Sequence, residues 1–107
     1  MTEYKIIKIT DLNGNDRTDG RYPIRIGRTC MIDLDDINKN LPMYIDYLKD
    51  ADGSDYSDNY LMTSRVQSAE VEEITDGLQV LFGLTGDYCR KRLVVTTLNT
   101  IYTFEQC

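Results

Sequence analysis

The chain has 107 residues, and its 12 Lys and Arg side chains against 18 Asp and Glu give a net charge of -6. It contains no His, which excludes a Ser-His-Asp triad, a Cys-His pair and a His-ligated zinc site. The length excludes a Rossmann enzyme and a TIM barrel. We therefore expect a single domain over residues 1–107 that is not an enzyme and binds no cofactor.

The start of the chain and the cysteines point to a cytosolic protein. No apolar run approaches the roughly 20 residues that a membrane helix requires. The apolar stretch after the first five residues is too short for a signal peptide and is interrupted by Lys8. Cys30, Cys89 and Cys107 are odd in number and far apart, whereas secreted disulfide scaffolds carry an even, dense set. We expect free thiols and no contact with a membrane.

Short runs of alternating apolar and polar residues recur between turn residues, and no window shows a sustained 3.6-residue period. The first run ends in the turn string at residues 13–16. Pro23 is expected to begin the second strand or to lie at its edge, because it cannot donate to a ladder. Asp76 and Gly77 predict a hairpin turn. The runs that predict strands cover residues 4–12, 23–34, 43–48, 60–66, 71–74, 78–82, 93–97 and 100–104.

These runs predict an all-β fold of about six or seven short strands with no long helix. A small, partly open barrel accounts best for the strand edges at this size. The strand count and the stretch from Val94 to Phe104 resemble the SH3-like small barrels. The resemblance is one of architecture, because the ALYDY-type signature and the groove tryptophan of signalling SH3 domains are absent. It therefore does not imply binding of proline-rich peptides. If the last strand, residues 100–104, lies at an edge, it would allow a homodimer.

Negative charge is concentrated in the middle of the chain, where residues 33–76 hold 12 acidic and 3 basic side chains. The longest polar stretch, residues 50–59, must be a loop. Its carboxylates and neighbouring tyrosines predict a surface that docks a protein with a basic surface, through electrostatic steering and tyrosine anchors. The plain alternative is a solvated loop. The candidate partner-binding residues are Asp50, Asp52, Asp55, Tyr56, Asp58 and Tyr60.

The same acidic stretch suits two other interpretations. A short acidic protein can occupy the basic groove of a bacterial nucleic-acid enzyme by imitating phosphate spacing, as phage-type inhibitors do. Basic side chains that interrupt the acidic face would argue against this alternative. The Asp-x-Asp-Gly string resembles the centre of a calcium loop, but placing Gly53 at the sixth position puts Leu48 and Asn59 at positions where neither can act as the required ligand. Only a weak, irregular calcium site is left open, and no metal site is predicted.

Basic residues near both ends of the chain give a further alternative, a small-barrel nucleic-acid binder. Arg25 is expected to face outward, and the two basic sets would form one patch if their strands were neighbours. The acidic middle argues against nucleic acid. A thiol function at Cys89 or Cys107 is also open, although no His could serve as its base. The candidate nucleic-acid patch consists of Arg17, Arg21, Arg25, Arg28, Arg90, Lys91 and Arg92.

Overall fold

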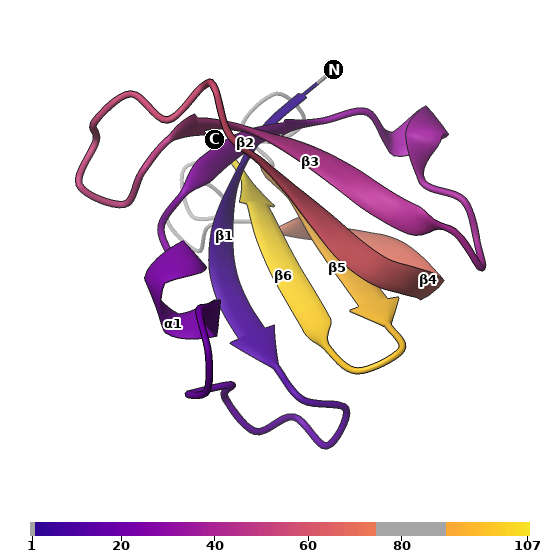
Figure 1. Ribbon diagram of the computed structural model, residues 1–107. Helices are drawn as coiled ribbons and strands as arrows, with labels where there is room; N and C mark the ends of the chain where they lie inside the picture. Colours follow the sequence, from indigo (N-terminus) through magenta and orange to yellow (C-terminus); the bar gives the residue numbers. More distant parts are fainter. Residues whose placement is uncertain (1, 75–89) are drawn as a thin grey trace, which may run out of the picture.

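A computed structural model describes residues 2–74 and 90–107. In these residues six antiparallel strands follow chain order around a closed barrel (Figure 1). Over these described residues, the all-β class, the small barrel and the absence of a long helix are confirmed, with the barrel closed rather than partly open. The elements are β1 (Thr2–Thr10), α1 (Tyr22–Arg25), β2 (Thr29–Ile32), the 3₁₀-helix η1 (Leu34–Asp36), β3 (Pro42–Lys49), β4 (Tyr60–Ile74), β5 (Arg90–Thr97) and β6 (Ile101–Gln106).

The core fills the barrel because alternate residues of each strand point inward. On β3, Met43, Ile45 and Tyr47 are buried, as their alternation predicts, while Tyr44 between them is exposed. Removing such apolar side chains from water is the main force that closes the barrel. The buried apolar residues are Tyr4, Ile6, Ile9, Cys30, Ile32, Met43, Ile45, Tyr47, Leu61, Val66, Leu93, Val95, Tyr102 and Phe104.

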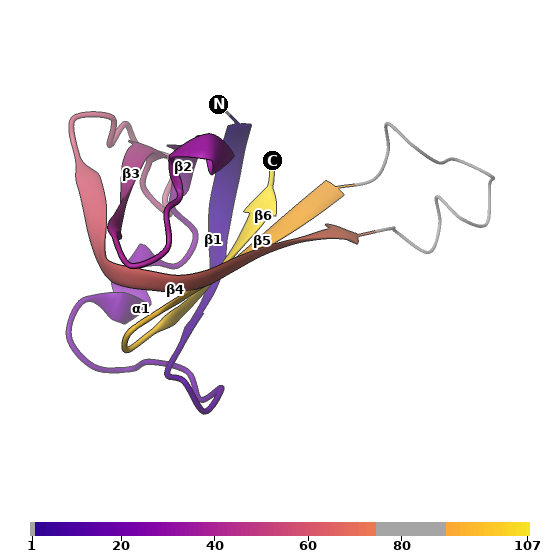
Figure 2. The ribbon, with the colours of Figure 1, turned by 90° about the vertical axis from the view of Figure 1, so that its right-hand side faces the viewer.

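β4 is one continuous strand of 15 residues, where the sequence suggested two separate runs at 60–66 and 71–74. Its first part pairs with β3, and from Val66 onward it pairs with β5. A register shift between Val66 and Ser68 marks the bulge at which the strand changes partner. Figure 2 shows the paired ends of β4 and β5 reaching away from the barrel. The predicted turn at Asp76 and Gly77, and the run at 78–82, lie outside the described residues.

The prediction that Pro23 begins or borders a strand is wrong, because Pro23 lies in the first turn of the short helix α1. Proline is favoured there, since its fixed φ suits a helix and its missing N–H has no intrahelical partner in any case. No helix in residues 2–74 and 90–107 is long and apolar enough to span a membrane.

Residues 100–104 do not lie at a sheet edge, so the condition set for a homodimer through the last strand is not met. β6 pairs with β1 on one side and with β5 on the other. Its backbone N–H and C=O groups are used within the barrel, so it offers no free edge for the homodimer that was considered.

Candidate functional site

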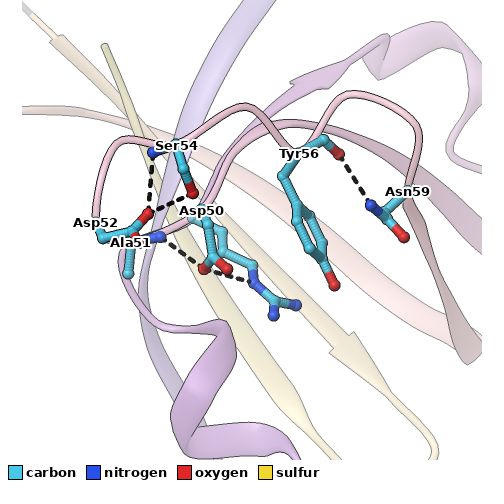
Figure 3. A network of polar contacts seen from close by, with 7 residues as sticks. Asp50, Ala51, Asp52, Ser54, Tyr56 and Asn59 are labelled. Atoms are coloured by element: carbon cyan, nitrogen blue, oxygen red, sulfur yellow. Dashed lines mark hydrogen bonds and ion pairs between the residues drawn. The ribbon is translucent and has the colours of Figure 1, made fainter.

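The acidic loop between β3 and β4, residues 50–59, uses its carboxylates to hold its own turns (Figure 3). Asp52 Oδ1 accepts hydrogen bonds from the Ser54 backbone N–H at 2.9 Å and from the Ser54 hydroxyl at 2.6 Å. Asp55 Oδ1 accepts one from the Ser57 backbone N–H at 3.0 Å. These bonds lower the pKa of both carboxyl groups. Two predicted partner-binding residues therefore stabilise the loop itself.

The loop is anchored to the barrel by an arginine that the sequence placed in a nucleic-acid patch. Arg28 is only 8% exposed, and its Nε donates to Asp50 Oδ1 at 3.1 Å. Its guanidinium carbon lies 5.0 Å from the ring centroid of Tyr47 and 4.4 Å from that of Tyr56. The two rings meet edge to face at 5.3 Å. Asp50 and Tyr56 thus contact a buried cation of the same chain.

Gly27 allows this approach of Arg28 to the loop. Its φ is +94°, a conformation that favours glycine, and a Cβ at this position would lie 3.0 Å from the Ala51 Cβ. The Gly27 N–H donates to the Ile6 carbonyl at 2.8 Å, which fixes the chain against β1. Arg28 follows directly and is carried beside the carboxylate of Asp50.

Asp58 and Tyr60, the remaining partner-binding candidates, are both exposed. Tyr60 belongs to an outward-facing group on β3 and β4 that the sequence analysis only partly identified. Tyr44 and Tyr60 are each 64% exposed and Met62 is 53% exposed. Tyr44 is paired in register with Met62, and Asp46 with Tyr60. The centroids of the two tyrosine rings lie 6.2 Å apart. We call Tyr44, Asp46, Tyr60 and Met62 the tyrosine face.

The strand alternation contained the signal for this face. Tyr44 and Asp46 occupy the outward positions of β3 between buried neighbours. Met62 lies outward between Leu61 and Thr63, which are both buried. Charge density is higher in the loop than on the strands, so charge alone points to the loop and not to the outward positions that β3 and β4 bring together.

A groove of about 350 Å³ borders the tyrosine face on the side of η1. Its walls carry the carboxylates of Asp33, Asp36 and Asp46 together with the ring of Tyr44. Asp33 also caps η1, because its Oδ1 accepts a hydrogen bond from the Asp35 N–H at 3.1 Å. The groove therefore combines negative charge with an exposed aromatic ring.

The two basic sets do not form the single patch that was considered. Arg17 is paired with Asp19 at 2.9 Å and donates to the Asn99 carbonyl at 3.0 Å, in the turn between β5 and β6. Arg92 lies at the opposite end of that hairpin, in register with Glu105. The turn and the Arg92 end are separated by most of the length of β5.

The other basic positions have mixed surroundings. Arg25, which was expected to face outward, is half-buried, and its guanidinium carbon lies 5.1 Å from the ring centroid of Tyr22. Lys91 is exposed and in register with Glu73 of β4, where opposite charges face each other. Arg90 is the first residue of β5, in register with Ile74.

The thiols differ in accessibility. Cys30 is fully buried, and burial raises its pKa to about 12, so it holds no thiolate at neutral pH. Cys107 is exposed, yet desolvation and the neighbouring Glu3 raise its pKa as well. Neither environment activates a nucleophile. Cys89 lies outside the described residues.

In residues 2–74 and 90–107, no group of three or more Cys, Asp or Glu side chains is arranged to hold a metal ion. Comparisons with protein-family models, with curated proteins and with solved structures find no match to the chain.

Proposed function

We propose that the chain is a non-enzymatic, cytosolic protein-interaction module that docks a protein with a basic surface through the tyrosine face and the acidic groove beside it. The observation that carries this proposal is the exposed pair Tyr44 and Tyr60, next to Met62, with Tyr44 also lining a groove that contains three aspartates. Tyrosine and methionine are enriched in protein interfaces, and tyrosine is a frequent energetic anchor. Aromatic rings and carboxylates together attract Lys and Arg side chains.

The proposed docking surface lies on β3 and β4 rather than in the loop of residues 50–59. Three of the loop residues first considered, Asp50, Asp52 and Asp55, have hydrogen-bonding roles within the fold. Their charge still contributes to long-range steering of a basic partner. Short-range contacts come from Tyr60 and from the neighbours of Tyr60 on β3 and β4. The relation to SH3-like barrels is proposed at the level of architecture alone, and no peptide preference is taken from it.

The phage-type inhibitor remains an alternative within the same class of acidic docking proteins. Its binding groove would belong to a nucleic-acid enzyme, and its key feature would be the spacing of carboxylates. The pairing of Arg28 with Asp50 argues against a continuous row of free carboxylates along the loop. Asp33, Asp36 and Asp46, which border the groove, are the acidic residues that this alternative would use.

The proposal is tested by binding of octa-arginine and octa-lysine peptides, with octa-glutamate as the negative control. Amide shifts in NMR spectra report both the affinity and the surface that is contacted. We expect Tyr44→Ala combined with Tyr60→Ala to weaken binding at least about tenfold, because interface anchors of this type contribute roughly 2 kcal/mol or more. The net charge is unchanged in this variant, so steering is preserved.

A matched control is Leu98→Ala, which removes an exposed apolar side chain (49% exposed) from the turn between β5 and β6. It should bind the peptides as the natural chain does. Equal binding by the tyrosine variant and the natural chain would refute the proposal, because charge alone would then account for the affinity. Once the surface is established, capture from host lysate with the same pair of variants identifies the partner.

A further inference from the structure

A second concave site lies between α1 and the acidic loop. It has a volume of about 200 Å³. Three of the four arginines of the N-terminal basic set, Arg21, Arg25 and Arg28, line it together with Tyr47 and Tyr56. The sequence placed these arginines in an extended nucleic-acid patch, whereas the fold gathers them around one small pocket.

The charge around this pocket is positive. Asp50 neutralises Arg28, with which it forms an ion pair at 3.1 Å. In the part of the chain that the structure describes, no carboxylate lies within ion-pair distance of Arg21 or Arg25. Arg25 lies beside the Tyr22 ring and hydrogen-bonds the Tyr102 side chain, contacts that do not neutralise its charge. The two uncompensated arginine charges match the charge of a phosphate dianion. Guanidinium groups bind phosphate oxygens through paired, charge-assisted hydrogen bonds.

A buried hydroxyl gives an independent indication of a ligand. Tyr47 is 3% exposed and lines the pocket, with its ring beside the Arg28 guanidinium, which can only donate to the hydroxyl oxygen. The Tyr47 O–H has no acceptor among the described residues. Buried polar groups are nearly always hydrogen-bonded, so an O–H without an acceptor at the wall of a cationic pocket suits a ligand that supplies one. A phosphate oxygen supplies one. The Asn59 side chain lines the same pocket and adds an amide that can donate.

We propose that this pocket binds a single phosphate group, as inorganic phosphate or as a small phosphomonoester. Arg21 and Arg25 provide the charge, and Arg28 and Tyr47 form the buried wall. The pocket volume is below the roughly 300–1,000 Å³ of pockets that enclose drug-sized ligands. The pocket therefore holds the phosphate group, and the rest of a phosphomonoester lies outside it. The pocket shares Tyr60 with the tyrosine face, but its charge has the opposite sign, so phosphate binding does not rest on the proposed basic partner.

The test is an NMR titration of the full chain with inorganic phosphate, O-phosphoserine and adenosine monophosphate at constant ionic strength, with sodium chloride and sodium acetate as controls. We expect saturable shifts of the amides of Arg28, Tyr47 and Asn59 with the phosphates and none with chloride. Tighter binding of either ester than of inorganic phosphate identifies the ester as the ligand class, and equal affinity identifies the free ion. Absence of a saturable shift, or equal shifts with chloride, would overturn the proposal.

Three variants separate recognition from general charge. Arg21→Gln combined with Arg25→Gln should weaken phosphate binding about tenfold or more. Each substitution removes charge-assisted hydrogen bonds to the phosphate, and such bonds contribute more binding free energy than neutral ones. Arg65→Gln also removes an exposed arginine, but from the interior of β4, in register with Pro42, and should change affinity less than twofold. Because the first variant removes two charges and the second removes one, an equal loss of binding free energy per removed charge would show that only net charge matters and would refute the site.

Tyr47→Phe removes the hydroxyl and keeps the ring. Because the Tyr47 O–H has no acceptor in the fold and only Arg28 can donate to its oxygen, we expect the urea midpoint of the variant to stay close to that of the natural chain. Phosphate affinity should nevertheless fall several-fold. Unchanged phosphate affinity would exclude Tyr47 from the site and would contradict the assignment of its hydroxyl to the ligand.

Discussion

Replacement of Asp50 by Asn should destabilise the barrel, although the substitution lies in an exposed acidic loop. The Asp50 carboxylate accepts from Arg28 Nε at 3.1 Å and from the Ala51 N–H at 2.7 Å. Both bonds go to Asp50 Oδ1, so Asn retains the accepting oxygen but leaves Arg28 without its counter-charge. A hydrogen bond to a charged group contributes about 1.5–3 kcal/mol. Breaking a buried ion pair costs about 3–5 kcal/mol.

The expected loss of unfolding free energy is smaller than that for a fully buried ion pair, because the Asp50 side chain is 32% exposed and water can partly replace it. We expect the free energy of unfolding to fall by about 1–2 kcal/mol. With a urea m value of about 1–3 kcal/mol per molar, the midpoint moves down by roughly 1 M. Circular dichroism at increasing urea concentration measures this shift.

Asp58→Asn is the matched control. It lies in the same loop, is exposed, and changes the net charge by the same amount. Its free energy of unfolding should stay within about 0.5 kcal/mol of that of the natural chain. Equal midpoints for Asp50→Asn and Asp58→Asn would refute the argument that Arg28 depends on Asp50. The comparison also matters for binding studies, since a variant that neutralises Asp50 combines a folding defect with a loss of surface charge.

Two further predictions concern the turns that hold the loop. Gly27→Ala should lower the free energy of unfolding in urea by at least about 1 kcal/mol more than Gly14→Ala does. Both glycines have a positive φ, but only at Gly27 would a Cβ lie 3.0 Å from the Ala51 Cβ. Equal losses in the two variants would contradict the close approach. Because the pKa values of Asp52 and Asp55 are lowered in the fold, their contribution is present above pH ~4 and is lost as pH falls through the lowered values. Replacing both aspartates by Asn should make the free energy of unfolding depend less on pH below about pH 4. An unchanged pH dependence would show that the hydrogen bonds of Asp52 and Asp55 do not contribute to stability.

The strand pattern was predictable wherever one side of a strand is buried. The alternation of Met43, Ile45 and Tyr47 gives the inward side of β3 directly. The continuity of β4 was missed because residues 68–73 are exposed on both sides, which removes the alternation. Between Val66 and Val71 the sequence contains no Gly, Pro, Asn or Asp, so the absence of turn residues was the available signal for one strand.

The burial of Arg28 could not be predicted, because its surroundings come from distant parts of the chain. Tyr47 and Tyr56 enclose the guanidinium group, and Asp50 pairs with it. No local pattern around Arg28 reports these contacts. The sequence signal that exists is Gly27, whose conformational freedom allows the backbone to approach the loop. An isolated glycine before an arginine is too common a pattern to identify a buried cation.

A count of charges along the sequence describes this surface poorly, because hydrogen bonds decide which charges face a partner. Asp50 is used by Arg28, and Asp52 by Ser54, so a carboxylate-rich loop offers fewer free acceptors than its composition indicates. Tyr44 and Tyr60 are uncharged, yet each leaves nearly two thirds of its surface exposed. Desolvation of such rings supplies short-range binding energy, whereas exposed charges mainly accelerate encounter. Substitution of the tyrosines at constant charge is therefore the decisive perturbation, because it separates the two contributions that neutralising aspartates would mix.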